Sequence, residues 1–450
     1  MAVTITPARL SAFDILLKIE RTQGHCDELL RTRQVEVLAP IDRNLCTTLV
    51  MGTLRWQIAL DAEINTFLKR PDFKLSDEVR VALRMGVFQL LHLDRIPPHA
   101  AISESVELAK HGENKFAAGM VNAVLRKIAA GGSRSQHDSS TAAGIARTTA
   151  HPAWLVERWV AAYGLEAAAA ICAFDQEQPP LQVRIASSQA EESLLQEGIE
   201  LAPANFLTRA RRVIKGDVTV TVTYRKGLVR IQDEGSQLVA ELAGEGARIL
   251  DCCAAPGGKT AILAERNPAA EIVACDVSMR RLEQMKGLLR ALPEKTHVRF
   301  QVADATKLHF MNDFDLVLCD VSCSGTGTIA RNPEIRHRLK AEDFARHHER
   351  QVAILNSAMS TVKQGGRLLY STCSLEPEEN EQVVEECLQR AASFEVMPLE
   401  LQLGTLVKSG AIDQPNAAAL RDSGFRGPYL RTLPGVHPCD GFFAAMLVRK

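Results

Sequence analysis

The fold of this chain is decided by the stretch RILDCCAAPGGKT, residues 248–260. Its first four residues, with Ile249 and Leu250 at their centre, suit a short buried strand, and small residues and glycines follow. Small residues after a strand let a ligand approach the backbone closely, and the next helix offers its N-terminus to that ligand. The stretch therefore predicts a ligand-binding turn between a strand and a helix.

Two other interpretations of this turn compete. A Gly-Gly pair alone is more typical of an ordinary strand-to-helix connection. Gly258-Lys259-Thr260 also matches the end of a phosphate-binding P-loop, but that motif requires glycine at position 253, where Cys253 stands. The P-loop is excluded, and the choice between a plain turn and a binding turn depends on the surrounding residues.

Short β-type runs alternate with helical segments from about residue 236 onward. This alternation predicts an α/β domain of the Rossmann-like type, a doubly wound, mostly parallel sheet with helices on both faces. Ligands bind such sheets beyond the carboxyl ends of the strands. The predicted strands are 248–251, 271–276, 298–302, 315–320 and 367–371.

Acidic residues stand at or just beyond the ends of the first three predicted strands, at Asp251, Asp276 and Asp304. In dinucleotide-type folds an acid at the end of the second strand hydrogen-bonds a ribose, and Asp276 holds that position. Asp304 is placed to meet an adenine or its amine. Any one of these acids is explained equally well as a helix cap, but the three in order indicate an adenosine-containing cofactor.

Two cysteines, Cys323 and Cys373, follow the ends of the last two predicted strands, and Asp320 ends the first of these. Most single cysteines only fill cores. These two lie where ligands bind, beside helix starts that lower the pKa of a thiol. A zinc site is the weaker alternative, because Cys319 and Cys323 have loose ligand spacing and no CxxC or His-x-His pair completes the set. We expect no metal.

The amino-terminal part, residues 1–135, is predicted to be helical, because apolar residues recur there at helical spacing and Ser76 offers a cap. The clearest helix covers 76–91, and a second helical run covers 102–110. Residues 136–150 have the small, polar composition of a linker. The apolar residues of the first helix are Leu83, Val87, Leu90 and Leu91.

Residues 151–235 carry mixed signals. A helix is predicted from Trp154 to Phe174, and the alternation of valine and threonine over 218–222 predicts a half-buried strand. We expect a small α+β subdomain here, similar to an RRM and able to bind RNA.

Composition limits the kind of protein this can be. The chain has 450 residues, a formal net charge of -1 and 11 cysteines. Such a balance excludes a polycation that coats nucleic acid indiscriminately, so nucleic-acid contacts must come from local basic patches. With no signal-peptide pattern and no apolar run long enough to cross a membrane, we expect reduced thiols and a cytoplasmic location.

Basic residues gather in two places. Over 205–235 they outnumber the acids, and a phosphate-binding role is slightly favoured over a solvated face. Over 331–350 the two interpretations are level. The residues of the first cluster are Arg209, Arg211, Arg212, Lys215, Arg225, Lys226 and Arg230; those of the second are Arg331, Arg336, Arg338, Lys340, Arg346 and Arg350.

Residues 248–260, 315–327 and 370–381 resemble the signature motifs of the Nop/Sun family of RNA cytosine methyltransferases, and YSTCSLEPEENE at 370–381 is close to diagnostic. Residues 42–55 and 116–128 resemble the NusB-like RNA-binding domain. That pairing is characteristic of the bacterial RsmB/Fmu branch, which modifies small-subunit (16S) ribosomal RNA.

The resemblance implies site roles. Cys373 is the nucleophile that adds to carbon 6 of the cytosine, Cys323 assists product release, and Asp320 contacts the base ring or the methionyl end of the cofactor. S-adenosylmethionine is the implied cofactor, held by Asp320 together with the turn and strand-end residues Cys253, Ala254, Ala255, Pro256, Gly257, Gly258, Lys259, Asp276 and Asp304.

One position departs from the family pattern. The family usually has proline immediately before the first motif cysteine, where this chain has Ser322. In DNA cytosine methyltransferases the cysteine of that Pro-Cys pair is the nucleophile, so its absence favours Cys373. A DNA substrate is accordingly least favoured.

Alternatives concern the substrate and the activity. The same chemistry could act on transfer RNA or another rRNA position, and the chain could be a non-catalytic RNA-binding assembly factor. The trio Asp320, Cys323 and Cys373 speaks against a scaffold, which has no need of it. We expect a monomer whose partner is small-subunit rRNA, with no membrane association.

Overall fold

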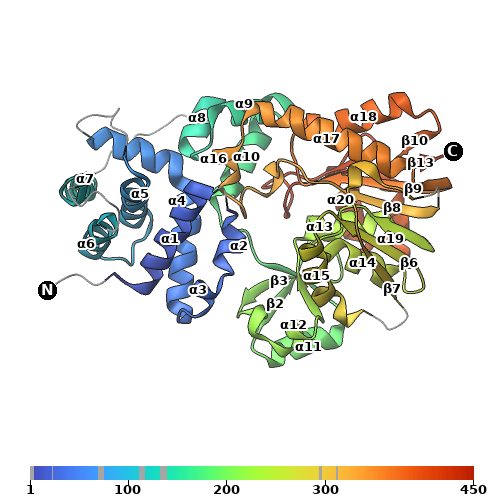
Figure 1. Cartoon of the computed structure of the whole chain (residues 1–450), viewed down its shortest axis with the longest axis horizontal. Coiled ribbons are helices and arrows are strands. Elements are labelled where there is room, and N and C mark those ends of the chain that lie inside the picture. Colours follow the sequence, from blue (N-terminus) through green and yellow to red (C-terminus); the bar gives the residue numbers. More distant parts are fainter. Residues whose placement is uncertain are drawn as a thin grey trace. The chain divides into compact units, whose positions relative to one another are not determined.

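The computed structural model describes residues 5–22, 24–68, 75–110, 117–131, 139–292, 296–310 and 313–450. The chain forms two compact units, and the second is interrupted by the first. The helical unit contains the chain up to Gln178 together with Ile329–Arg338, and the second unit contains Pro179–Thr328 and Leu339–Lys450. The elements of both units are labelled in Figure 1.

The helical unit is built around one apolar core shared by its longer helices. At its centre α4 and α5 approach closely, because Gly52 leaves room for the ring of Phe88, which would lie 1.9 Å from a Cβ at position 52. The predicted helix over 76–91 is α5, in which Leu83 and Val87 are fully buried but Leu91 is 44% exposed. The core helices are α1 (Pro7–Thr22), α4 (Pro40–Phe67), α5 (Asp77–His92), α6 (Pro98–Ala109) and α7 (Ala117–Gly131), with short α2 (Cys26–Leu30) and α3 (Arg33–Glu36) beside them.

Two expectations for the end of this unit need correction. Of the predicted linker over 136–150, residues 136–138 lie outside the described part, and α8 (Ala142–Thr148) forms where a linker was expected, with Ile145 buried. The predicted helix over 154–174 is two helices, α9 (Ala153–Tyr163) and α10 (Leu165–Gln176). They are divided at Gly164, whose φ of 85° is the left-handed conformation that glycine favours.

The segment 329–338 belongs to the helical unit although its sequence neighbours belong to the other. Arg55 donates to the carbonyl of Ala330 over 2.9 Å, and Arg338 donates to that of Gly24 over 2.7 Å. Helix α16 (Ile335–Arg338) lies within it and places Arg336, 1% exposed, beside Asp175. The methyltransferase-type domain predicted for 236–450 is thus interrupted here.

A small antiparallel sheet opens the second unit, in the order β2-β3-β1-β4. Val183 and Ile185 of β1 face the core beneath α11 (Ser188–Gln196). The strand expected over 218–222 is wrong. Asp217 caps a 3₁₀ turn, η1 (Val218–Val220), and Thr221 caps α12 (Val222–Arg225), so the capping side chains override the alternation. The strands are β1 (Gln182–Ile185), β2 (Glu200–Pro203), β3 (Ala210–Lys215) and β4 (Val229–Ile231).

The large sheet is parallel over β7-β6-β5-β8-β9 and continues through the antiparallel strands β13, β12 and β11, with β10 beside β13. The predicted α/β, doubly wound, mostly parallel sheet is confirmed. The strands are β5 (Arg248–Asp251), β6 (Glu271–Asp276), β7 (His297–Val302), β8 (Phe314–Asp320), β9 (Val362–Thr372), β10 (Phe394–Met397), β11 (Phe425–Arg426), β12 (Tyr429–Arg431) and β13 (Phe443–Arg449).

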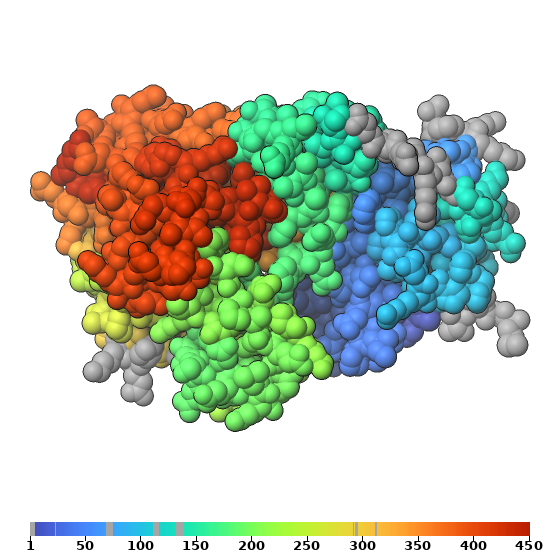
Figure 2. Space-filling model, turned by 180° about the vertical axis from the view of Figure 1, so that it is seen from behind, coloured from blue at the N-terminus to red at the C-terminus, as the bar shows by residue number. Residues whose placement is uncertain are grey.

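Successive residues of each strand enter different cores. Ile249 packs with α13 (Glu234–Ala243), α14 (Gly258–Arg266) and α19 (Gln402–Lys408), whereas Leu250 packs with α17 (Ala341–Met359) and α18 (Glu381–Arg390). This two-residue period explains why the strands read as continuous apolar runs, since both faces are covered. Further helices of this unit are α15 (Met279–Leu288) and α20 (Gln414–Ser423). Seen from behind, the orange-to-red carboxyl-terminal segments adjoin the green segments of the small sheet (Figure 2), where Thr208 donates to the carbonyl of Gly410.

Candidate active site

The carboxyl ends of β8 and β9 bring the two predicted cysteines together. The strands are parallel and in a register that places Asp320 opposite Ser371. In the segments that follow these two strands, the Sγ atoms of Cys323 and Cys373 lie 3.4 Å apart. Residues far apart in sequence therefore form one thiol pair at the edge of the sheet where ligands bind.

Lys259 and Asp320 form an ion pair next to these thiols. The Nζ of Lys259 lies 2.8 Å from Oδ2 of Asp320, and Ser371 donates to Oδ1 of the same carboxylate over 2.7 Å. Lys259 also lies 5.2 Å from the centre of the Phe442 ring. Burial disfavours the Lys259 charge, but Asp320 outweighs burial and raises the pKa of the ammonium, to which the charge of Cys373 also contributes. A fixed positive charge thus lies near Cys373.

A cleft of about 350 Å³ opens at the ends of β5, β6 and β7. Five of the ten predicted cofactor residues line this cleft. The other five belong to the turn 253–259 and are not part of the lining. Those in the lining are Cys253, Ala255, Asp276, Asp304 and Asp320; those outside it are Ala254, Pro256, Gly257, Gly258 and Lys259. Gly257, with φ of 105°, is the cap of α14, and a Cβ there would lie 2.5 Å from Met285.

Two arginines also line this cleft, and only Arg281 was not among the predicted residues. Arg281 lies 3.1 Å from Oδ2 of Asp276 and donates to the carbonyl of Ala255 over 2.8 Å. Its place in the helix after Asp276 is a signal that sequence reasoning could have used. Arg350 comes from α17 and belongs to the second basic cluster, for which phosphate binding and a solvated face were equally favoured.

The pKa values of two thiols at the site differ from the lowered pKa expected for cysteines beside helix starts. The pKa of Cys323 is raised well above the usual range, first by its hydrogen bond with Cys373, then by burial, and further by the charges of Cys373 and Glu379. The expectation of a lowered pKa is therefore wrong for Cys323. Burial likewise raises the pKa of Cys253, which lines the cleft as a neutral thiol.

Asp251, at the end of β5, is a buried acid beneath the turn. Burial raises its pKa to about 7, while the hydrogen bond from Thr260 lowers it and the charge of Asp320 raises it. Thr260 donates to Oδ2 over 2.6 Å, whereas Oδ1 has no hydrogen-bond partner. The acid is placed to hold the turn, not to meet a ligand directly.

The basic cluster over 205–235 is mostly engaged within the protein. Arg230 is 4% exposed and paired with Glu265, and Arg211 forms two hydrogen bonds with Glu191. These two cannot neutralise RNA phosphates without breaking those pairs, so the phosphate interpretation is wrong for them. Arg225 and Lys226 remain exposed. In the second cluster Arg336 is likewise buried.

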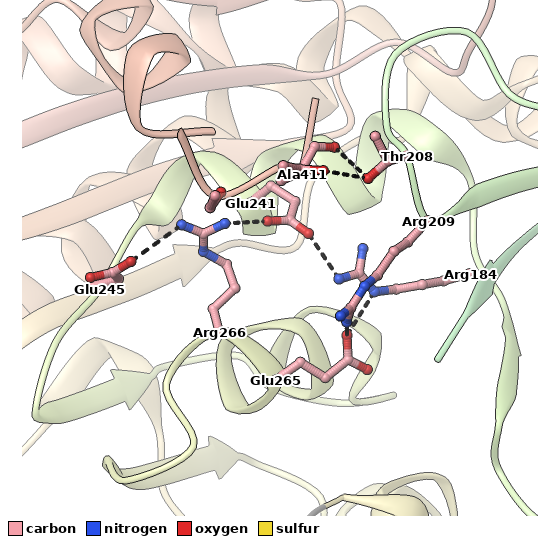
Figure 3. Close-up of a pocket in the computed structure, with 10 residues that line it drawn as sticks. Arg184, Thr208, Arg209, Glu241, Glu245, Glu265, Arg266 and Ala411 are labelled. Carbon is pink, nitrogen blue, oxygen red and sulfur yellow. Dashed lines mark hydrogen bonds and ion pairs between the residues drawn. The ribbon is translucent and has the colours of Figure 1, made fainter. Parts of the chain in front are cut away.

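A second pocket lies where the small sheet meets α13 and α14 (Figure 3). Its charged side chains pair with one another: Arg184 lies 2.8 Å from both Glu241 and Glu265, and Arg266 lies 2.6 Å from Glu241. Arg209 approaches Glu265 to 3.6 Å. Because acids and bases offset each other, this is an ion-pair cluster joining the small sheet to the helices, and it occupies the sheet face that an RRM would offer to RNA bases.

The sheet order and the cleft at the strand ends define the second unit as a Rossmann-like methyltransferase domain, and family models agree. The model for 16S rRNA methyltransferase RsmB/F matches residues 240–448, that for the NusB family matches 6–130, and the RsmF/B-like ferredoxin-like domain matches 151–216. The predicted all-α NusB-like domain is confirmed.

Curated relatives match nearly the whole chain. The probable ribosomal RNA small subunit methyltransferase B of Bacillus subtilis is 34% identical, covering 99% of each chain. The ribosomal RNA small subunit methyltransferase B of Pseudomonas syringae is 33% identical, covering 98% of this chain and 96% of its own. The chain belongs to the RsmB/F family of 16S rRNA methyltransferases.

Solved structures share the fold. The crystal structure of PH0851 superimposes with a TM-score of 0.80 at 23% identity, covering 99% of this chain and 100% of the other. A methyltransferase homologue from Pyrococcus horikoshii gives a TM-score of 0.55 at 24% identity, covering 69% of this chain and 99% of its own. In the part of the chain that is described, no helix has the length and apolar character needed to cross a membrane.

Proposed function

We propose that this chain transfers the methyl group of S-adenosylmethionine to carbon 5 of a cytosine in small-subunit rRNA, through a covalent bond between Cys373 and carbon 6. The observation that carries the proposal is the thiol pair of Cys323 and Cys373, 3.4 Å apart beside the cleft. The names of the curated relatives support the substrate class.

The cleft suits the proposed cofactor. Its volume of about 350 Å³ is within the range of small-molecule sites. Asp276 would hold the ribose and Asp304 the adenine, and Cys253 and Ala255 of the turn would hold the remainder. Val277 and Ile354 supply apolar surface. When bound, S-adenosylmethionine supplies an electrophilic methyl group on a sulfonium.

Carbon 5 of cytosine is a poor nucleophile, and Cys373 is proposed to activate it. Addition of the Cys373 thiolate to carbon 6 raises the electron density at carbon 5, which splits one hard step into easier ones. Lys259 stabilises the negative charge of the Cys373 thiolate. Asp320 holds the base ring or the methionyl end of the cofactor.

Cys323 assists the end of the reaction. After carbon 5 is methylated its proton passes to solvent water, the double bond between carbons 5 and 6 re-forms, and the bond to Cys373 breaks with the electron pair leaving on sulfur. The raised pKa of Cys323 keeps its proton on sulfur at neutral pH, so this thiol can hydrogen-bond the departing Cys373 thiolate without competing with it as nucleophile.

The RNA must present an unstacked cytosine to this site. The NusB-family region, 6–130, is the proposed anchor for the rest of the RNA. Exposed Arg225 and Lys226 of the small subdomain would add salt-sensitive phosphate contacts.

The test is mass spectrometry of nucleosides from unmodified, protein-free small-subunit rRNA incubated with the enzyme and S-adenosylmethionine. Cys373→Ala and, as a matched control, Cys387→Ala, a buried thiol of α18, run in parallel. We expect 5-methylcytosine with the wild type and the control, and none with Cys373→Ala. Product on transfer RNA alone, or cofactor binding with no product on any RNA, would contradict the proposal.

A further inference from the structure

A fully buried carboxylate, that of Glu379, lies beneath the two cysteines. Glu379 ends η5 (Pro377–Glu379) and is 0% exposed. Its Oε1 accepts hydrogen bonds from the backbone amide of Ser324 over 2.8 Å and from Nε2 of Gln351 over 3.1 Å. Its Oε2 accepts from the hydroxyls of Ser324 and Ser374. About four acceptor sites exist on a carboxylate, and each is used here.

Two of these donors, Ser324 and Ser374, each adjoin a cysteine of the thiol pair. Ser324 follows Cys323 in the chain, and Ser374 follows Cys373. Gln351 acts on the other side of Cys323, because its Nε2 also donates to the carbonyl of Ser322 over 3.0 Å. One carboxylate therefore ties together the residues that flank both thiols, although they come from the loops after two different strands.

All four hydrogen bonds run towards Glu379, which is the acceptor in each. An ionised carboxylate only accepts, so both hydroxyls must point their protons at Glu379. Hydrogen bonds to a charged acceptor are shorter and stronger than those between neutral groups, and leaving such a buried group without them is costly. The two loops are thus locked to one point instead of packing independently.

We propose that Glu379 is a positioning residue that sets the separation of Cys323 and Cys373, with Gln351 holding the Ser322 side of the same loop. The inference rests on the proposed function for its catalytic consequence, but the geometric claim stands on the thiols alone. Gln351 restrains the carbonyl of Ser322, the residue that stands where the family usually has proline. The negative charge of Glu379 lies near Cys323, whereas the positive charge of Lys259 lies near Cys373, so the two thiols have opposite electrostatic surroundings.

Glutamine at position 379 is the informative conservative change. Its amide oxygen accepts from Ser324 and Gln351, and its NH₂ donates to the two hydroxyls, which can turn to accept. Glu379→Gln should therefore keep the loops in place, whereas Glu379→Ala removes every bond. Glu234→Ala is the matched control, since Glu234 is also 0% exposed and accepts the backbone amides of residues 205–207, none of which adjoins either cysteine in the chain.

The first readout needs neither RNA nor cofactor. The full-length protein is treated with diamide, which takes up the two thiol hydrogens as it oxidises a thiol pair to a disulfide, and the Cys323–Cys373 linked peptide is quantified with time. We expect Glu379→Ala to slow its formation at least roughly tenfold, because a 1 Å misplacement costs about two orders of magnitude in well-oriented reactions. Glu379→Gln and Glu234→Ala should form it at close to the wild-type rate.

The second readout is methylation. We expect kcat to fall roughly a hundredfold in Glu379→Ala with the KM for S-adenosylmethionine little changed, and to recover in Glu379→Gln. If Glu379→Ala does not fold, Ser324→Ala, which removes one bridging hydroxyl, should show the same pattern in smaller degree. If folded Glu379→Ala and Ser324→Ala form the disulfide and methylate RNA as fast as the wild type does, the inference is overturned. If even the wild type methylates no RNA, the proposed function fails while the disulfide rates still decide the positioning claim.

Discussion

Lys259 and Asp320 form a 2.8 Å ion pair that joins the turn after β5 to the end of β8. This pair connects the two halves of the proposed chemistry, because Asp320 lines the cleft and Lys259 lies close to Cys373. It also explains why lysine stands in a turn that resembles a P-loop but lacks its first glycine. The Lys259 ammonium interacts with the Asp320 carboxylate and the Cys373 thiol of the same protein, whereas a P-loop lysine binds a phosphate.

Replacing Lys259 by methionine should therefore impair catalysis more than folding. Asp320 would lose its ion-pair partner, and the negative charge that develops on Cys373 would lose its interaction with the Lys259 ammonium. We expect kcat to fall roughly 10- to 100-fold, the effect typical of removing one electrostatic contact of about 1.4 to 2.7 kcal/mol. Steady-state kinetics with Lys259→Met and Lys259→Arg test this, and a methionine variant as active as wild type would contradict it.

Cys323→Ala should trap the enzyme on its RNA. If Cys323 assists the elimination of Cys373, its loss leaves the covalent adduct in place after methyl transfer. A protein–RNA band should then persist on a denaturing gel and disappear in the double variant with Cys373→Ala. A Cys323→Ala protein that turns over normally would show that Cys323 has no part in release.

Asp276→Ala should weaken cofactor binding without unfolding the sheet. A hydrogen bond to a charged acceptor contributes about 1.5–3 kcal/mol, so the dissociation constant for S-adenosylmethionine should rise roughly 10- to 100-fold. Calorimetric titration measures this directly. Asp422→Ala, an exposed acid elsewhere in the same unit, is the control and should bind as the wild type does.

The raised pKa of buried Asp251 should make the free energy of unfolding fall as the pH rises towards 7. Burial raises the pKa of this acid to about 7 from an ordinary value of 3.8, so the folded state holds its proton more tightly than the unfolded state. The stability contributed by the protonated group is present at low pH and is lost as the pH rises towards 7. Asp251→Asn, which stays neutral, should gain in melting temperature relative to the wild type between pH 5 and pH 8. An unchanged difference across that range would contradict the assignment.

Gly52→Ala should destabilise the helical unit. An added Cβ would lie 1.9 Å from Phe88, and overpacking of a core typically costs about 1–3 kcal/mol. Gly119→Ala on α7 is the matched control, since nothing lies within 4 Å of a Cβ there. The control should be neutral or slightly stabilising in thermal unfolding, and equal behaviour of the two variants would contradict the packing argument.

The catalytic sheet was predictable because its signals are local. The run 248–251 and the run 271–276 each match a strand to the residue, since both are short, apolar and bounded by turn residues. Parallel strand ends meet at one edge, so the meeting of Cys323 and Cys373 followed from topology alone.

What could not be predicted depends on partners distant in the chain. The alternation over 218–222 suits a strand, but the capping side chains of Asp217 and Thr221 select helical turns. Gln351 reaches the site from the middle of α17, and nothing in its neighbourhood marks it; the basic cluster includes the adjacent Arg350 but does not place it at the cleft. Glu379 lies inside the family motif, yet only the folded loops reveal that it accepts from both Ser324 and Ser374.

The bond between Cys373 and the cytosine that is methylated can be tested most directly by peptide mapping. The protein is mapped after reaction with small-subunit rRNA containing 5-fluorocytosine, whose fluorine blocks the loss from carbon 5 that precedes release. We expect a peptide that carries methylated 5-fluorocytidine on Cys373. Attachment to Cys323, or methylated RNA with no adduct on either thiol, would contradict this expectation.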